Sequence, residues 1–218
     1  MPSKLVIAID GPAGAGKSTI AKLLASRLDL RYLDTGAMYR ALALKAAREG
    51  VEGQSAADLT DETNISFGAG DPQIVLLDGE DVTEAIRTPE IGEAASALSQ
   101  HPAVRRKMVA LQQAFVREGG VVLEGRDTTT VVAPEAQVKL YMTASLEERA
   151  RRRTHEFAGK GVTAGFERVR SEIEQRDHRD ITREDSPLEV APDAHVVETA
   201  TLTVDEVLER VMSLISAE

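Results

Sequence analysis

The chain passes from a short apolar run into a glycine-rich loop and then into a helical pattern within residues 5–19. Residues 5–9 have the composition of a buried strand, and the loop after Asp10 reads Gly-x-x-x-x-Gly-Lys-Ser over positions 11–18. Glycines there let backbone N–H groups turn inward around phosphate oxygens, and the positive end of the next helix adds to the field. A strand, a phosphate loop and a helix in this order predict an α/β chain that binds a nucleoside triphosphate.

The fixed side chains of the loop have separate roles in holding a triphosphate. Lys17 supplies a charge to the β- and γ-phosphates, and the Ser18 hydroxyl is a ligand for Mg²⁺. We therefore expect the phosphates of ATP at residues that run through the loop into the helix: Gly11, Pro12, Ala13, Gly14, Ala15, Gly16, Lys17, Ser18 and Thr19.

Composition narrows the class of protein. The chain has 218 residues, a formal net charge of −10 and no cysteine. The acidic balance argues against a nucleic-acid or membrane surface, and without cysteine there are no disulfides, zinc–thiolate sites or thiol catalysis. The four histidines lack the spacing of metal ligands. Because the first apolar run is too short for a signal sequence or a membrane span, we expect a cytoplasmic protein without nucleic-acid or membrane partners.

Helix-like and strand-like stretches alternate after the loop, which predicts a parallel sheet flanked by helices. Further strands are expected over residues 31–34, 121–124, 137–142 and 195–198. Helices are expected over residues 17–29, 36–49, 89–100, 102–118, 165–180 and 204–215. Thr35 is expected to cap the second helix, and Ser145 with Glu148 to form a capping box. Residues 61–88 predict a small β insert with strands over 64–67 and 73–77, and residues 157–164 a glycine-containing loop.

The phosphate loop alone does not identify a reaction. The guanine-binding pattern Asn-Lys-x-Asp is impossible here, because the only asparagine, Asn64, is followed by Ile65. Three further segments are informative: Tyr32-Leu33-Asp34-Thr35-Gly36-Ala37-Met38-Tyr39-Arg40, Glu124-Gly125-Arg126-Asp127 and Arg176-Asp177-His178-Arg179-Asp180-Ile181-Thr182-Arg183. Together with the loop, and in this order, they resemble the bacterial cytidylate kinases. The resemblance covers essentially the whole chain, including the β insert and Thr88-Pro89-Glu90 ahead of Ala94-Ala95-Ser96.

The resemblance implies a single α/β P-loop kinase domain over residues 1–218. Its core would comprise residues 1–60, 119–150 and 181–218, with a monophosphate-binding insert and helices over 61–118 and a lid region over 151–180. The implied reaction transfers the γ-phosphoryl group of ATP to CMP, and also to dCMP, with Mg²⁺, and gives ADP and CDP. We expect a monomer whose partners are these nucleotides.

The resemblance also implies roles for side chains outside the loop. The monophosphate pocket would be lined by Thr35, Tyr39 and Arg40. The edge of cytosine would be read by Ser96, Arg105 and Asp127. The acceptor phosphate would be clamped by Arg40, Arg126 and Arg183, and the sugar held by Arg176 and Asp180. Residues 157–166 would form the lid over ATP, flanked by Arg149, Arg152 and Arg153.

General chemistry supports these roles. Phosphoryl transfer brings two anions together, and planar guanidinium groups bind two phosphate oxygens at once. Residues 145–185 contain ten of the 26 lysines and arginines, and nine of the ten are arginine. The groups expected to neutralise the transferring charge are Lys17, Arg126, Arg152, Arg153 and Arg183. Glu124, and less directly Asp10, would hold Mg²⁺ through water.

Plainer interpretations of the same residues stay open. The arginines at 149, 152 and 153 share one helix face and could simply be solvated beside acidic neighbours. Arg126 and Asp127 could form an ion pair within a turn, Asp180 and Arg183 could pair along a helix, and Tyr39 could belong to the core. For the whole chain, the alternatives are a P-loop kinase acting on another small acceptor and a non-catalytic regulatory module that binds ATP.

One segment departs from the family pattern. After Arg126-Asp127 that pattern has Ile or Met and then Gly, whereas this chain has Thr128 and Thr129, followed by Thr130. A β-branched residue is strained at positive φ. Either the loop follows another path here, or no positive φ is required.

Overall fold

The computed structural model describes residues 4–68, 70, 73–159 and 161–216. By packing, the chain divides into two compact units. Unit 1 comprises Met1–Leu33 and Phe115–Glu218, and unit 2 comprises Asp34–Ala114. The chain therefore leaves unit 1 after the second strand and returns to it near the end of a helix.

A parallel sheet forms the centre of unit 1. The strand order is β2-β6-β1-β7-β8, and β1 pairs in parallel with β6 and β7, and β7 with β8. Every residue of β1 is buried, which explains why this strand consists of apolar residues ending in Asp10. The strands of unit 1 are β1 (Val6–Asp10), β2 (Arg31–Asp34), β6 (Val121–Glu124), β7 (Val138–Thr143) and β8 (His195–Glu198).

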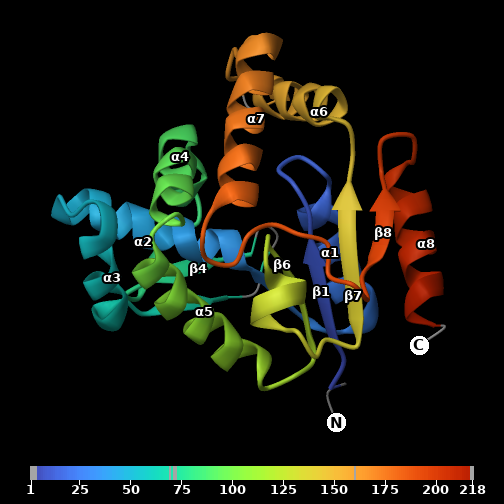
Figure 1. The fold of residues 1–218 in the computed structure, drawn as a ribbon, viewed down its shortest axis with the longest axis horizontal. Coiled ribbons are helices and arrows are strands. Elements are labelled where there is room, and N and C mark those ends of the chain that lie inside the picture. The colour runs from blue at the N-terminus through green and yellow to red at the C-terminus, as the bar shows by residue number, and fades with distance from the viewer. Residues whose placement is uncertain (1–3, 69, 71–72, 160, 217–218) are drawn as a thin grey trace. The chain divides into compact units, whose positions relative to one another are not determined.

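In unit 1, α8 lies next to β8, and the chain passes from the end of β7 into α6 (Figure 1). The main core of unit 1 joins the sheet to α1 and α8, through residues such as Leu24, Leu140 and Val211. A smaller core joins α6 to α7 around Ala150, Val169 and Ile173. The helices of unit 1 are α1 (Lys17–Leu28), α6 (Leu146–Gly159), α7 (Phe166–Thr182) and α8 (Val204–Ile215).

Unit 2 combines helices with a small antiparallel sheet of order β3-β4-β5. Its core lies between α2 and this sheet and contains Ala41, Leu77 and Ile86. The strands are β3 (Ile65–Phe67), β4 (Val75–Leu77) and β5 (Glu80–Asp81). The helices are α2 (Thr35–Glu49), α3 (Ala56–Leu59), α4 (Pro89–Leu98) and α5 (Pro102–Val116), the last of which ends in unit 1.

The fold confirms the expected parallel sheet, the β insert and nearly all element positions, with three corrections. The cap of α2 is Asp34 and not Thr35, because the Asp34 carboxylate accepts from the Ala37 N–H at 2.9 Å and Thr35 is already helical. The expected loop at 157–164 begins later, since α6 continues to Gly159, and residue 160 lies outside the described residues. In the described part of the chain, only half of the expected capping box is present. Ser145 Oγ accepts from the Glu148 N–H at 3.2 Å, as expected of a cap, but the Glu148 carboxylate accepts from Arg151 and Arg152 and does not complete the box.

Several short elements were not expected from the sequence, among them α3 and a π-helical turn. The helix α3 is four residues long and lies between 3-10 turns, and Thr128–Val132 forms one turn of π-helix. Thr129 is not among the described residues with positive φ. The loop at 128–130 therefore has no left-handed residue in this chain, and Thr129 is not strained there. Across the described part of the chain, every helix is too short or too polar to cross a bilayer.

Candidate active site

The phosphate loop runs from the end of β1 to the start of α1. Gly11, Gly14 and Gly16 have φ values of 144°, 79° and 91°. A Cβ on Gly11 would lie 2.0 Å from the carbonyl oxygen of Met142 in β7, so only glycine fits there. Among the described residues, no side chain caps the start of α1, which leaves its first N–H groups to a bound anion.

Lys17 is buried at the start of α1. Its Nζ donates to the carbonyl oxygens of Gly11 and Pro12, both at 2.8 Å. Burial and the nearby Arg126 lower the pKa of Lys17 to about 7, although Glu124 opposes the shift. The Lys17 ammonium therefore lies over its own loop. A bound phosphate, being an anion, would stabilise the charged form of this side chain.

Arg149 and Asp177 hold the loop at Ala13. Arg149 Nη1 donates to the Ala13 carbonyl at 3.0 Å and to Asp177 Oδ2 at 2.5 Å, and the Ala13 N–H donates to Asp177 Oδ1 at 3.3 Å. Arg149 thus contacts the loop itself, through the Ala13 carbonyl. Sequence analysis gave Asp177 no role, because its partner lies 28 residues earlier on α6 and one sequence does not reveal such a pair.

Two arginines converge on Asp180 near the end of α7. Arg126 Nε lies 2.9 Å from Asp180 Oδ2, and Arg183 Nη1 lies 3.4 Å from Asp180 Oδ1. Arg183 Nη2 lies 3.8 Å from Asp127 Oδ1. Burial opposes ionisation of Asp180, yet Arg126, Arg176 and Arg183 hold its pKa below the ordinary value. The pairing expected between Asp180 and Arg183 is confirmed, and Arg126 reaches across to Asp180.

Glu124 and Asp10 end neighbouring strands of the parallel sheet and are both buried. Glu124 Oε1 accepts from the Tyr32 hydroxyl at 2.5 Å. Asp10 accepts from Thr128 and Thr129. Both carboxylates lie close enough to Lys17 to raise its pKa, and Asp10 is in addition engaged with the turn after β6.

Unit 2 contains the other expected acceptor residues. Arg105 is 1% exposed, its guanidinium lies 5.6 Å from the centre of the Tyr39 ring, and its Nη1 lies 3.4 Å from the Ser99 carbonyl oxygen. Tyr39 is thus part of the core and also contacts an expected ligand-binding arginine. Ser96 is buried too, and its Oγ has no hydrogen-bond partner among the described residues.

Arg40 and Asp34 form a second polar pair in unit 2. Arg40 Nη2 lies 2.7 Å from Asp34 Oδ2, while Arg40 Nε is buried without a partner in the described part of the chain. Burial opposes ionisation of Asp34, but Arg40 and the Ala37 N–H hold its pKa below the ordinary value. Thr35, the residue after Asp34, is buried. A Cβ on the next residue, Gly36, would lie 3.2 Å from Arg40 Nη1. Among the described residues, unit 2 has several buried donors without a partner, and those on Ser96 and Arg40, which a ligand could satisfy, belong to residues expected to bind the acceptor.

The remaining arginines of α6 have protein partners. Arg152 donates to Glu148 at 2.8 Å and to the carbonyl of Thr199 at 2.6 Å. Arg153 lies 2.8 Å from Glu156, stacks on the Phe157 ring at 4.7 Å and is 40% exposed at its side chain. Hydrogen bonds from Arg151 and Arg152 lower the pKa of Glu148 to about 2. Both interpretations of this face, a solvated surface and a charge-neutralising group, remain compatible with these contacts.

The two side chains expected to hold Mg²⁺, Ser18 and Glu124, offer oxygen atoms, which suit a hard cation. Ser18 is exposed at the loop and Glu124 is buried at the end of β6. Within the described ranges, no group of three or more histidine, aspartate or glutamate residues could hold a metal ion.

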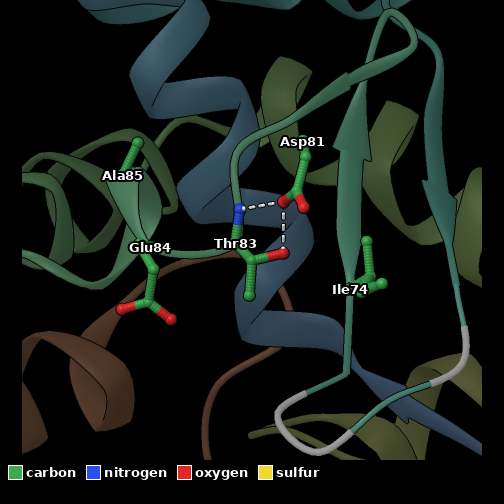
Figure 2. A pocket seen from close by; sticks show the side chains of 5 residues that line it. All are labelled: Ile74, Asp81, Thr83, Glu84 and Ala85. Atoms are coloured by element: carbon green, nitrogen blue, oxygen red, sulfur yellow. Dashed lines mark hydrogen bonds between the residues drawn. The ribbon is translucent and has the colours of Figure 1, made fainter.

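A separate hollow of about 470 Å³ lies in unit 2, lined by Ile74, Asp81, Thr83, Glu84 and Ala85. Figure 2 shows the Asp81 carboxylate accepting from the N–H and the hydroxyl of Thr83, at 2.9 and 2.6 Å. These bonds close a local turn and occupy the carboxylate. None of the five lining residues is an expected ligand-binding residue, so the hollow does not define the active site.

Comparisons with known proteins agree with this arrangement. A family profile described as Cytidylate kinase matches residues 7–217. The cytidylate kinase of Pelotomaculum thermopropionicum is 47% identical over 97% of this chain and 96% of its own, and that of Enterococcus faecalis is 48% identical over 97% and 96%. A structure of shikimate kinase from Acinetobacter baumannii in complex with shikimate has a TM-score of 0.50, covers 99% of this chain and 95% of its own, and is 16% identical. This last likeness shows a shared fold.

Proposed function

We infer that the chain, which belongs to the cytidylate kinase family, transfers the γ-phosphoryl group of ATP to CMP and so forms ADP and CDP. The observation in the structure that best supports this function is the buried Lys17 over a glycine loop with positive φ at three positions. An ammonium whose hydrogen bonds go to the carbonyls of its own loop is ready to exchange them for phosphate oxygens.

We propose that residues 11–19 of unit 1 bind the phosphates of ATP, with Lys17 neutralising charge that develops during transfer. Arg149 would act on ATP through the loop, because its guanidinium donates to the Ala13 carbonyl. Mg²⁺, when bound, neutralises and orients the phosphates, and Ser18 and Glu124 would hold it. The chemistry of these two oxygen ligands supports that assignment.

For the acceptor, we propose that unit 2 binds CMP through Thr35, Tyr39, Arg40, Ser96 and Arg105. Ser96 Oγ and Arg40 Nε, which have no partner in the part of the chain that the structure describes, support this assignment, because a buried donor without a partner costs about 1–3 kcal/mol that a ligand can recover. From unit 1, Asp127 would accept from the amino group of cytosine, Arg126 and Arg183 would bind the acceptor phosphate, and Arg176 and Asp180 the sugar.

These assignments need no separate general base. The acceptor phosphate is already ionised, so the protein has to align two anions, neutralise their charge and exclude water. Asp180 supports this role, because it orients Arg126 and Arg183 before substrate arrives. Arg152 and Arg153 would act with the lid of residues 157–166, of which residue 160 lies outside the described residues. The activity on dCMP, the monomeric state and the cytoplasmic location stay predictions.

A coupled assay for ADP release separates this function from its alternatives. With ATP and Mg²⁺, we expect turnover that depends on CMP and dCMP and is much weaker with UMP, AMP or dTMP. Turnover with a different acceptor would indicate a related small-molecule kinase. No acceptor-dependent ADP release with any of the five would indicate a regulatory module that binds ATP.

A further inference from the structure

The Asp10 carboxylate is fully buried at the end of β1 and is held by two consecutive threonines. Its Oδ1 accepts from the N–H of Thr128 at 2.9 Å and from the Thr128 hydroxyl at 2.7 Å. Its Oδ2 accepts from the N–H and the hydroxyl of Thr129, both at 2.7 Å. Among the described residues these are its four donors, so one turn of the chain satisfies the buried carboxylate.

This cluster joins two segments that the proposed function uses for different substrates. Asp10 directly precedes Gly11, whose carbonyl accepts from Lys17 in the phosphate loop. Thr128 directly follows Asp127, in the turn assigned to CMP. Because all these residues belong to unit 1, the four hydrogen bonds fix the start of the phosphate loop relative to that turn.

The hydroxyls are the part of this connection that depends on the sequence. Any residue except proline at 128 and 129 could supply the two N–H donors, whereas the second donor to each oxygen comes from a threonine hydroxyl. Thr130, the next residue, provides the contrast, because its Oγ1 is buried without a hydrogen-bond partner in the described part of the chain. Hydrogen bonds to the charged form also counter the effect of burial, which raises the pKa of Asp10.

We propose that Thr128 and Thr129 are positioning residues for phosphoryl transfer, whose hydroxyls fix the phosphate loop relative to the Arg126–Asp127 turn through Asp10. This inference rests on the proposed function, because it assigns the two segments to donor and acceptor. In-line transfer requires the two phosphates in a narrow range of geometries, and a small misplacement costs rate more than it costs binding. Loss of the hydroxyls should therefore lower kcat and leave the KM values nearly unchanged.

The test compares Thr128→Val, Thr129→Val and the double variant with Thr130→Val as the matched control. Valine keeps the branched shape and removes the hydroxyl. We expect each single variant to lower kcat about tenfold and the double variant about 100-fold, with KM for ATP and CMP within about threefold. Thr130→Val should stay within about twofold. Thr128→Ser and Thr129→Ser, which keep the hydroxyl, should restore most of kcat.

A purely structural role would give a different pattern. In that case the double variant would melt at a lower temperature but keep the wild-type kcat when assayed well below melting, and the proposal would be overturned. Amide hydrogen exchange gives a second readout that needs no turnover. We expect faster exchange over residues 11–18 in the double variant and no change in Thr130→Val, and equal exchange would also contradict the proposal. Failure of the proposed function would instead appear as a wild-type protein without CMP-dependent ADP release.

Discussion

Lys17 keeps an ammonium group in a buried position where its hydrogen bonds go to two backbone carbonyls. Asp10 and Asp180 are buried as well, and each is satisfied differently, the first by threonine donors and the second by arginines. Burying ionisable groups costs solvation free energy, and such groups are typical of functional sites. At the scale of single residues, the structure thus concentrates charge on the expected phosphate loop and on the turn after β6.

The lowered pKa of Lys17 predicts proton uptake when ATP binds. With a pKa of about 7 in the free protein, Lys17 is mostly neutral at pH 8. Phosphate charge raises that pKa, so binding at pH 8 should take up close to one proton, and ATP affinity should fall as pH rises from 7 to 9. Calorimetry in two buffers of different ionisation enthalpy measures the uptake. A Lys22→Ala variant should behave like wild type, and binding without proton uptake would contradict the prediction.

Asp127 should control the choice of base. Its carboxylate can accept from the N4 amino group of cytosine but faces O4 of uracil lone pair to lone pair. One or two such mismatches, at about 1–3 kcal/mol each, predict that kcat/KM for CMP exceeds that for UMP by roughly one to three orders of magnitude. Asp127→Asn should narrow this ratio, because an amide can donate to O4.

The outcome also separates two roles for Asp127, which lies 3.8 Å from Arg183. A variant that loses rate on both substrates and keeps the full ratio would show that Asp127 orients Arg183 or the turn and does not read the base. The comparison needs kcat/KM for both acceptors at saturating ATP.

At the scale of elements, local patterns predicted most of the structure. The strand β8 and the helix α8 lie where the apolar spacing placed them, and the glycine at 50 ends α2 with φ of 66°. The cap at Asp34 and the π-helical turn at Thr128–Val132 were not foreseen. The first depends on which of two adjacent side chains reaches an N–H, and the second on hydrogen bonds to a residue 118 positions earlier.

Two glycines in different elements predict opposite effects on stability. Gly11→Ala would place a Cβ 2.0 Å from a backbone oxygen at a φ of 144°, so we expect a loss of about 3–5 kcal/mol or a failure to fold. Gly92→Ala, in α4 with open space around it, should raise the free energy of unfolding by about 0.5–1 kcal/mol. Urea denaturation measures both, and a Gly11→Ala protein as stable as wild type would contradict the close approach to β7.

Substitutions on the outer face of α6 test the role of the two arginines assigned to the lid, Arg152 and Arg153. If Arg152 and Arg153 neutralise transferring charge, Arg152→Ala or Arg153→Ala should lower kcat more than it raises KM for CMP. Arg151→Ala is the matched control, because this side chain is 69% exposed and pairs with the same Glu148 as Arg152. Changes within about twofold for all three variants would show that this face is a solvated surface.

At the scale of the whole molecule, each of the two units has its own hydrophobic core and its own set of buried polar side chains. Unit 1 contains the phosphate loop and the arginines around Asp180, and unit 2 contains Ser96 and Arg40, whose Oγ and Nε have no partner among the described residues. The motifs predicted the residues of both sets, but the division at Asp34 depends on the packing of α2 within unit 2, which no local pattern encodes. The roles proposed for Thr128, Thr129 and Asp177 likewise depend on contacts between distant segments.

The central claim is that this chain moves the γ-phosphoryl group of ATP onto CMP. The most direct measurement supplies ATP labelled at the γ-phosphorus with Mg²⁺ and CMP, and identifies the labelled product by chromatography. The account predicts labelled CDP in amounts equal to the ADP formed. It also predicts almost none with Lys17→Ala, which should keep the wild-type melting temperature to within a few degrees, because removing a desolvated charge offsets the loss of its hydrogen bonds to the Gly11 and Pro12 carbonyls. Label that stays in ATP or appears only as inorganic phosphate, or labelled CDP at the wild-type rate with Lys17→Ala, would contradict it.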